Sequence, residues 1–391
     1  MDFRFTTEQD EWRQEARSVI ESLITPELRR EMGHGDDLGP GDAQKQFMRA
    51  LGKKGLLGIS WPTRYGGLGR SLMDQYIFSE EMGRLGSPYD NGIAVNMVGP
   101  TIMRVGTDEQ RDEWLPKMLS GEVECALGYT EPGAGTDLAG LETSAVEDGD
   151  EFVINGQKMF TSAAHFSSHV WLLARTDPEA PKHRGLSVFL VPMDSPGITV
   201  RPLWRMDGGR TNEVFFDSVR VPLSALVGER DRGWYHVAMA LDFERVSIGG
   251  RYAGLLQRVN RLVAHANETR VNGELLSRNP HVRERFTELG VKLEVVRLFS
   301  YRTAWMIDQG HVPNYESSAL KIIGTDLIQE VADFGVELLG MYGQLTRESP
   351  HVMLDGEMER AYRSGIFLRF GGGANEVQRD IIARRGLGMP R

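Results

Sequence analysis

A glycine- and threonine-rich run, Thr130-Glu-Pro-Gly-Ala-Gly-Thr-Asp137, has the composition of a ligand-binding loop. It follows a short apolar segment that ends at Ala126. Glycine permits sharp turns and a close approach of the backbone to a ligand. Clustered backbone N–H donors beside threonine hydroxyls suit a carbonyl-rich ring or a phosphate. The run is therefore a candidate binding loop, and the alternative is an ordinary turn after a strand.

The same run closely resembles the flavin-binding signature of the acyl-CoA dehydrogenase family. The resemblance implies FAD as the cofactor. It places Leu127, Tyr129 and Thr130 against the flavin ring, with the Thr130 hydroxyl near the reactive nitrogen. It places Gly135 and Thr136 at the pyrophosphate or the substrate.

A second segment, Lys158-Met-Phe-Thr-Ser162, matches the place where many family members have Trp-Ile-Thr-Asn. Phe160 stands for the tryptophan that packs on the ring, and Ser162 replaces a threonine beside Thr161. An aromatic face and hydroxyl donors are both retained, so the resemblance assigns all three residues to the flavin. The alternative for Phe160 is a place in the core of a hairpin.

Dehydrogenation of a saturated acyl thioester needs a base for the α-proton, and a carboxylate kept from water suits that role. Many family members carry this glutamate in a Tyr-Glu-Gly-Thr run. Here the run is Gly371-Gly-Gly-Ala374, with Gly372 at the position of the base. Isovaleryl- and long-chain-type members carry the glutamate on the first helix of the C-terminal bundle instead. Leu241-Asp-Phe-Glu-Arg245 matches that pattern, so the resemblance implies that Glu244 is the base.

The residues around Glu244 are compatible with this role. On a helix Glu244 shares a face with mostly apolar neighbours, which would remove its carboxylate from water. The alternatives are a glutamate on the helix surface or one paired with Arg245 or Arg251.

Substrate contacts follow from the same resemblance. It assigns Arg245, next to Asp242, to coenzyme A, whose phosphates suit a cation. The alternative is an Asp242–Arg245 ion pair three residues apart. The N–H of Gly372 would lie beside the cofactor and donate to the thioester carbonyl, where charge develops. A glycine there also leaves room for a bulky or branched acyl group.

Three departures from the family pattern concern contacts to the cofactor, the first of them to the cofactor of a neighbouring subunit. Thr269-Arg-Val-Asn-Gly273 replaces an Arg-x-x-Phe-Gly segment, Glu337 replaces a glutamine, and Ala374 replaces a threonine. A buried carboxylate near a pyrophosphate would be repulsive. We therefore expect that a homo-oligomer, a dimer of dimers, binds flavin poorly. A related subunit of a heteromer would supply the missing arginine and glutamine.

The hydrophobic periodicity divides the chain into three segments. Residues 1–120 have helical spacing, and Thr6-Thr-Glu-Gln9 can cap the first helix. Residues 121–230 alternate as short strands, with Asn155-Gly156 as a hairpin signal. Residues 231–391 return to helical spacing. The prediction is an α+β multidomain fold: an N-terminal α-helical domain, a central β-barrel or sandwich, and a C-terminal four-helix-type bundle. This order is also the architecture that the resemblance implies.

Composition narrows the classes of partner. The net charge of −10 argues against nucleic acid. The single cysteine, Cys125, excludes an internal disulfide and is expected to fill the core. His165 and His169 lack a nearby glutamate in the zincin position, so no metal site is expected. No stretch of about 18 apolar residues occurs, so we expect no membrane span and a cytoplasmic location.

The leading hypothesis is an FAD-dependent acyl-CoA dehydrogenase that passes electrons to an electron-transferring flavoprotein. Two alternatives remain open. The same scaffold can serve a flavin oxidase or an oxygen-using hydroxylase. The chain can also be a half-site subunit that binds flavin poorly and shapes a partner's pocket.

Overall fold

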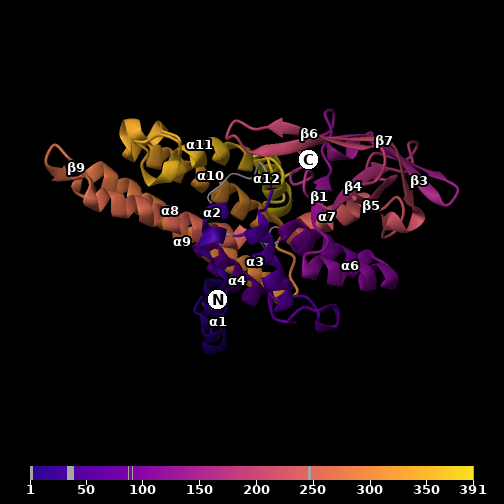
Figure 1. Ribbon diagram of the computed structural model, residues 1–391, viewed down its shortest axis with the longest axis horizontal. Coiled ribbons are helices and arrows are strands. Elements are labelled where there is room, and N and C mark those ends of the chain that lie inside the picture. Colours follow the sequence, from indigo (N-terminus) through magenta and orange to yellow (C-terminus); the bar gives the residue numbers. More distant parts are fainter. Residues whose placement is uncertain (1–2, 33–38, 87, 90, 245–247, 391) are drawn as a thin grey trace. The chain divides into compact units, whose positions relative to one another are not determined.

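A computed structural model of the chain describes residues 3–32, 39–86, 88–89, 91–244 and 248–390, with side chains between 239 and 251 left aside. The chain divides into two compact units, each built from separate parts of the sequence (Figure 1). The helical unit comprises residues 1–22, 72–87 and 245–391, and the sheet unit comprises residues 23–71 and 88–244. The helices of residues 1–120 are thus shared between the two units. The division into three sequential domains stays a prediction.

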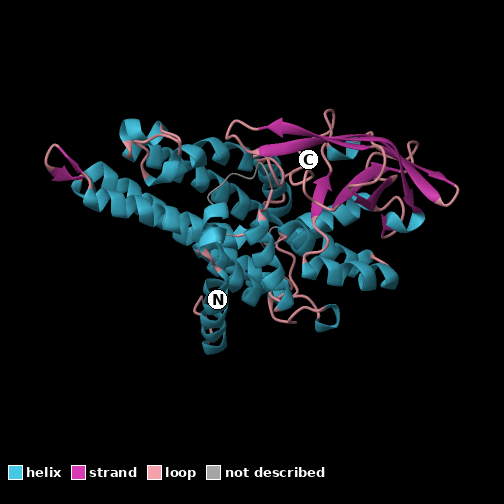
Figure 2. Ribbon diagram, in the orientation of Figure 1, coloured by secondary structure: helices cyan, strands magenta, loops and turns pink. Residues whose placement is uncertain are grey.

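Helices make up most of the helical unit (Figure 2). They are α1 (Thr7–Leu23), α4 (Leu72–Arg84), α8 (Ile248–Glu268), α9 (Pro280–Asp308), α10 (Asn314–Leu338), α11 (Glu357–Leu368) and α12 (Asn375–Ile381). A small hairpin of β9 (Arg270–Val271) and β10 (Glu274–Leu275) joins α8 to α9 (Figure 1). The predicted C-terminal bundle is confirmed.

The core of the helical unit forms along the apolar face of α8. Leu255, Val259, Leu262 and Ala266 recur at three- or four-residue spacing and are buried. They belong to one cluster with buried residues of α9 and α10, such as Leu289. Helix packing of an apolar stripe stabilises these long helices more than their intrinsic propensity does.

Hydrogen bonds fix the starts of α1 and α4. The side chains of Thr6 and Gln9 form a reciprocal capping box at the start of α1, as the sequence predicts. The start of α4 is capped by a residue distant in sequence. The Asp308 carboxylate accepts from the backbone N–H groups of Leu72 at 2.8 Å and Met73 at 3.0 Å.

We expect Asp308→Ala to lower the free energy of unfolding by about 1 kcal/mol, because α4 loses the acceptor for its first N–H groups. Asp308→Asn keeps an acceptor oxygen and should lose less. Denaturant unfolding of the two variants checks this order. An equal loss for both would assign the effect to charge rather than to capping.

A buried ionic cluster joins α1, α4 and α9. Glu80 and Glu81 are both nearly inaccessible to solvent. The Arg13 guanidinium reaches Glu80 at 2.8 Å and Glu81 at 3.3 Å. The hydroxyls of Tyr76 and Tyr301 donate to the Glu80 carboxylate. Burial and the charge of Glu80 raise the pKa of Tyr76, so this hydroxyl stays a donor. The carboxylates are therefore neutralised inside the helical unit.

The helices of the sheet unit are α2 (Pro26–Met32), α3 (Asp42–Lys53), α5 (Gly99–Val105), α6 (Asp108–Ser120) and α7 (Gly233–Glu244). The start of α6 has a capping box between Thr107 and Gln110. Its end is Gly121 at φ 74°, the left-handed position that glycine favours. Both ends follow local sequence rules, with an acidic first turn at Asp108 and Glu109 and a glycine directly after the helix.

The predicted central strand domain is confirmed as one eight-stranded sheet. Seven strands follow the order β6-β7-β3-β2-β4-β5-β8, and β1, the eighth, pairs with β4. The strands are β1 (Cys125–Gly128), β2 (Ser144–Asp148), β3 (Glu151–Lys158), β4 (His169–Arg175), β5 (Leu186–Pro192), β6 (Ile198–Trp204), β7 (Arg210–Pro222) and β8 (Leu226–Val227). Cys125 is buried at the start of β1, as expected of a core residue.

The hairpin predicted at Asn155-Gly156 is wrong. β2 and β3 turn at Gly149, where the sequence also indicates a turn, and Asn155 pairs with Ser144 inside the ladder. Gly156 lies at a register shift between β3 and β7, with φ 148°. A Cβ there would lie 2.5 Å from the Thr143 hydroxyl. Asn-Gly serves here as a bulge inside a strand, because tertiary packing leaves no space for a side chain at the second position.

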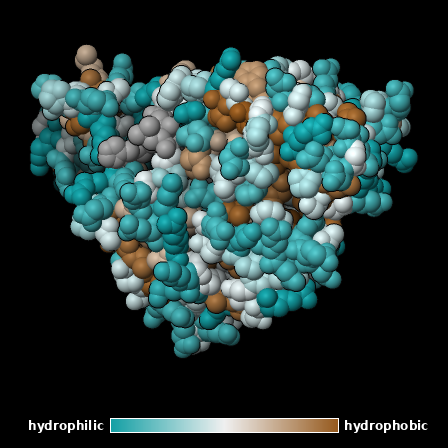
Figure 3. Space-filling model, turned by 45° about the vertical axis from the view of Figure 1, so that its right-hand side comes forward, coloured by the Kyte–Doolittle hydropathy of each residue, from teal (hydrophilic) through white to brown (hydrophobic). Residues whose placement is uncertain are grey.

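No described helix combines the length and hydropathy needed to cross a bilayer. On the face drawn in Figure 3, hydrophobic residues form separate patches among hydrophilic ones.

Candidate functional site

The binding loop, Thr130–Asp137, leaves the sheet at the end of β1. Tyr129 is buried, whereas Gly135 and Thr136 are exposed. The loop turns on itself through reciprocal backbone hydrogen bonds between Glu131 and Ala134. A Cβ added at Gly133 or Gly135 would meet no atom within 4 Å. Among the described residues, nothing fills the space beside these two glycines, so this side of the loop is open.

Phe160 lies at the end of β3 in a conformation that aromatic residues rarely adopt. Its φ is 56° and its side chain is 59% exposed. The alternative of a hairpin-core residue is therefore wrong. A strained backbone that presents an apolar ring to the outside is typical of a ligand site rather than of a stabilising contact.

Thr161 is fully buried beside this exposed ring. Asn212 on β7 makes two hydrogen bonds to the Thr161 backbone, both at 2.9 Å. The Asn212 backbone carbonyl accepts from the Thr161 N–H, and Asn212 Nδ2 donates to the Thr161 carbonyl. The Thr161 hydroxyl has no hydrogen-bond partner among the described residues. A buried unpaired hydroxyl is unfavourable unless a ligand or water completes it. Asn212 was not identified from the sequence, because its role depends on a register that pairs distant strands.

The binding loop and the end of β3 meet in space. The Met159 N–H donates to the Thr130 carbonyl at 2.8 Å. Lys158 extends beneath the loop, and its Nζ donates to the Tyr129 carbonyl at 3.1 Å and to Glu131 Oε1 at 2.7 Å. The structure thus brings together the two segments that the sequence assigned to the flavin ring. Leu127 belongs to the same region through its pairing with Trp171 on β4.

The Lys158–Glu131 ion pair is deeply buried, with side-chain exposures of 0% and 8%. Burial lowers the pKa of the Lys158 ammonium from 10.5 to about 8, although the Glu131 carboxylate opposes this change. Burial acts to raise the pKa of the Glu131 carboxyl, but Lys158 and the N–H of Glu142 outweigh it and lower that pKa. Both groups are therefore charged at neutral pH. This pair was not predicted from the sequence. The signal that could have indicated it is Lys158, a lysine at a strand position whose side chain points into the core.

The lowered pKa of Glu131 predicts a dependence of stability on acid. The folded chain binds a proton at Glu131 less readily than the unfolded chain, so this carboxyl contributes stability above its ordinary pKa of 4.5. That contribution is lost as the pH falls below this value. The difference in unfolding free energy between the native chain and Glu131→Gln should therefore shrink between pH 6 and pH 3, as measured by denaturant unfolding at each pH. A constant difference would contradict the ionised pair.

The predicted base and coenzyme A contacts fall at the end of α7. Asp242 and Glu244 belong to its last turn. Their side chains, and all of Arg245, lie outside the described residues. Their roles therefore stay predictions. Ser162 is exposed, and its hydroxyl lies 3.5 Å from that of Thr211.

Gly372 lies in a tight turn of the helical unit, with φ 67°. The turn is closed where the Asn375 N–H donates to the Arg369 carbonyl at 3.0 Å. Lys321 on α10 donates to the same carbonyl at 2.9 Å and to the Asn375 side chain at 2.7 Å. A glycine suits the left-handed conformation at the centre of this turn, which would strain a longer side chain.

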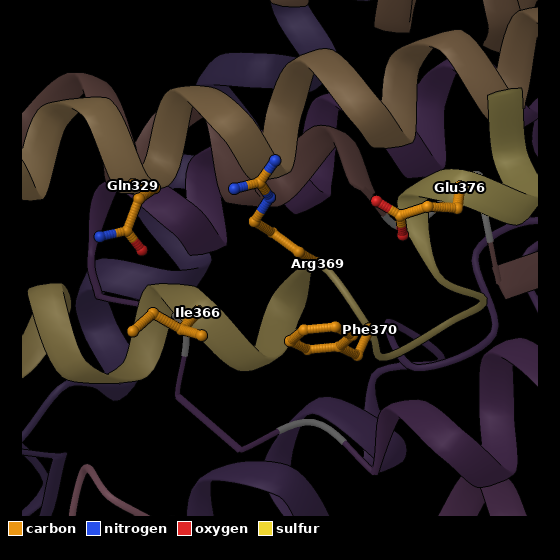
Figure 4. A pocket seen from close by; sticks show the side chains of 5 residues that line it. All are labelled: Gln329, Ile366, Arg369, Phe370 and Glu376. Carbon is orange, nitrogen blue, oxygen red and sulfur yellow. The ribbon is translucent and has the colours of Figure 1, made fainter.

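A pocket of 370 Å³ lies beside this turn within the helical unit (Figure 4). It is lined by Gln329, Ile366, Arg369, Phe370 and Glu376. Arg369 pairs with Asp326, with its Nε 3.1 Å from a carboxylate oxygen. None of the residues predicted from the sequence lines this pocket. It combines an aromatic ring with groups of both charges, which does not by itself select one class of ligand.

Residues 270–273 and Glu337 are exposed in the single chain, whereas Thr269 and Ala374 are half-buried. Arg270 donates to the Gly273 carbonyl at 2.8 Å across the β9–β10 hairpin. The Glu337 side chain is 61% exposed, 3.5 Å from His281 Nε2. The sequence led us to expect a buried Glu337 carboxylate, but in the single chain this carboxylate is exposed. Among the described residues, no group of three or more His, Cys, Asp or Glu side chains is arranged to hold a metal ion.

The sheet unit presents groups that would suit a flavin ring. Phe160 offers an exposed aromatic face, Thr161 a buried hydroxyl with no described partner, and Gly133 and Gly135 an open backbone. These residues fit FAD at the Thr130–Asp137 loop. Thr130 and Ser162 provide further hydroxyls beside the same space.

Comparison with known proteins identifies the class that this fold and site define. The family models for the N-terminal, middle and C-terminal domains of acyl-CoA dehydrogenases match residues 6–122, 126–219 and 231–387. The chain belongs to the acyl-CoA dehydrogenase family, whose members are flavin-dependent oxidoreductases.

Individual relatives span the whole chain. It is 39% identical over 401 residues to acyl-CoA dehydrogenase FadE26 of Mycobacterium tuberculosis, covering 100% of this chain and 99% of that protein. A solved structure described as the Tcur3481-Tcur3483 steroid ACAD is 40% identical with a TM-score of 0.92, covering 100% of both chains. The ChsE4-ChsE5 complex from Mycobacterium tuberculosis is 39% identical with a TM-score of 0.91, again covering 100% of both chains.

Proposed function

We propose that this chain catalyses the FAD-dependent α,β-dehydrogenation of an acyl-CoA thioester. The observation that carries the proposal is the meeting of the Thr130–Asp137 loop with the strained Phe160 and the buried hydroxyl of Thr161, which has no described partner. Family membership supports the reaction class.

Glu244 is the proposed base. Its place at the end of α7 matches the family subset that keeps the glutamate on this helix, and Gly372 leaves no carboxylate at the alternative position. The Glu244 carboxylate removes the α-proton of the thioester. The chemistry that FAD would supply when bound is acceptance of the hydride that leaves the β-carbon.

The other residues position the thioester and balance its charge. As its α-proton leaves, negative charge develops on the carbonyl oxygen, and the Gly372 N–H is the proposed donor to that oxygen. Arg245 and Asp242 are proposed to contact coenzyme A, with the Arg245 cation suited to its phosphates. The Thr130, Thr161 and Ser162 hydroxyls and the Phe160 ring are the groups that would hold the flavin ring.

The relatives support a bulky acyl group and a heteromeric assembly. One neighbour is described as a steroid ACAD of two components and another as a complex of two chains. The glycine at position 372 and the departures at Thr269 and Glu337 agree with both suggestions. We propose a polycyclic or branched acyl-CoA substrate, a related partner subunit and an electron-transferring flavoprotein as acceptor.

The experiment is purification from the native host with any co-purifying subunit, followed by anaerobic mixing with straight, branched and polycyclic acyl-CoAs. Bleaching of the flavin absorbance by at least one acyl-CoA is expected. Flavin that no acyl-CoA bleaches would overturn the dehydrogenase. Rapid reoxidation of the bleached flavin by oxygen would instead indicate an oxidase or a hydroxylase. Stoichiometric flavin in the chain purified alone would remove the need for a partner.

A further inference from the structure

A buried ion pair attaches the Thr130–Asp137 loop to the sheet unit, and no step of the proposed reaction uses it. Glu131 lies within the loop and Lys158 at the end of β3, with 2.7 Å between Lys158 Nζ and Glu131 Oε1. The lysine is fully inaccessible to solvent. Neither side chain can therefore contact a bound ligand through its charged group without a large rearrangement.

The pair joins three separate segments of backbone. Glu131 Oε2 accepts from the Glu142 N–H at 2.7 Å, and Oε1 accepts from the Thr143 N–H at 2.9 Å. Lys158 Nζ donates to the Tyr129 carbonyl at 3.1 Å. The end of β1, the approach to β2 and the end of β3 thus converge on two side chains. The loop between Tyr129 and Glu142 is held at both ends.

We propose that Lys158 and Glu131 are positioning residues that hold the Thr130–Asp137 loop in the open shape that admits a ligand; the identity of that ligand as FAD rests on the proposed function. The pair acts on the backbone of Tyr129, Glu142 and Thr143 rather than on the reacting atoms.

The backbone groups around Glu131 and Lys158 need hydrogen-bond partners, which explains why two charged side chains occupy these positions. A buried ion pair adds little net stability compared with apolar side chains of similar volume. Apolar replacements would, however, leave the Glu142 and Thr143 N–H groups and one acceptor site of the Tyr129 carbonyl without these partners. Buried backbone groups in native proteins are almost always paired. A carboxylate with two acceptor oxygens and an ammonium with several donors satisfy all three groups together.

The test compares Glu131→Gln, Lys158→Met and the double variant with the native chain. The matched control is Arg220→Met, which breaks an exposed pair with Asp148 and Glu151 in the same sheet. The first measurement is amide hydrogen exchange of residues 130–143 in the flavin-free chain. The second is the dissociation constant for FAD, from quenching of flavin fluorescence, with any co-purifying subunit present.

We expect exchange within residues 130–143 to rise roughly tenfold or more in Glu131→Gln and in the double variant, while β4 and β5 stay protected. The dissociation constant for FAD should increase roughly tenfold to a hundredfold, as when the outer support of a binding site is removed. The double variant should be more stable than Lys158→Met, because it has no unpaired buried carboxylate, yet its loop should stay loose. Arg220→Met should change neither measurement.

Three results would overturn the positioning role: unchanged exchange in the loop, an equal rise of exchange across the sheet unit, or a loosened loop with an unaltered dissociation constant for FAD. A native chain that takes up no FAD, alone or with its co-purifying subunit, would overturn the proposed function instead. In that case exchange in the flavin-free variants still decides whether the pair holds the loop.

Discussion

Glu244→Gln is expected to lower the turnover of acyl-CoA dehydrogenation by roughly two to four decades, the usual contribution of a general base. The amide has nearly the shape of the carboxylate but cannot accept the α-proton. Fold and flavin content should stay the same, because no proposed cofactor contact involves this residue. The measurement is the rate of flavin bleaching after rapid mixing with the best acyl-CoA of the panel.

Two further variants make this result specific. Glu244→Asp keeps a carboxylate at a shorter reach and should fall between the native chain and Glu244→Gln. Glu229→Gln makes the same chemical change at an exposed glutamate that precedes α7, and should leave the rate unchanged. Near-native bleaching by Glu244→Gln would remove Glu244 from the mechanism.

Arg13→Met is expected to lower the free energy of unfolding by about 3 kcal/mol, because removing one partner of a buried ion pair leaves an uncompensated charge. Arg13 is the residue that contacts both Glu80 and Glu81, and both carboxylates are buried. Arg17 at 2.8 Å and Arg84 at 3.9 Å also pair with Glu81, whereas the partners that remain for Glu80 among the described residues are the tyrosine hydroxyls. Denaturant unfolding measures the change.

The control is Arg384→Met, which breaks an exposed pair with Asp380 in the same unit. Its effect should stay within about 0.5 kcal/mol. The double variant Arg13→Met, Glu80→Gln should recover part of the lost free energy of unfolding, because it no longer contains the unpaired Glu80 carboxylate. Equal losses for Arg13→Met and Arg384→Met would show that solvent reaches the cluster and screens it.

The two buried ionic groups have different purposes. The cluster around Glu80 joins three helices and concerns the stability of the helical unit. The Lys158–Glu131 pair lies directly below the Thr130–Asp137 loop and concerns the shape of a site. Substitution in the first should change unfolding more than ligand binding, whereas substitution in the second should change both.

Local patterns in the sequence were sufficient for most of the secondary structure. The stripe of Leu255 to Ala266, the capping box at Thr6 and the glycine stop at Gly121 depend on residues three to five positions apart, and the capping box occurs as predicted. Asn155-Gly156 failed as a hairpin signal because packing against Thr143, a distant contact, decides its conformation. Short-range rules describe positions where neighbours along the chain dominate the energy.

By itself, the sequence determined the family, the binding loop and the candidate base, because motif wording and helical spacing are properties of contiguous residues. Tertiary structure alone decided that Phe160 is exposed, that the Thr161 hydroxyl is buried without a described partner, and that Lys158 reaches Glu131 beneath the loop. It also distributed the helices of residues 1–120 between two units. The reason is that burial and hydrogen bonding between distant strands depend on register and packing, which no local pattern of residues encodes.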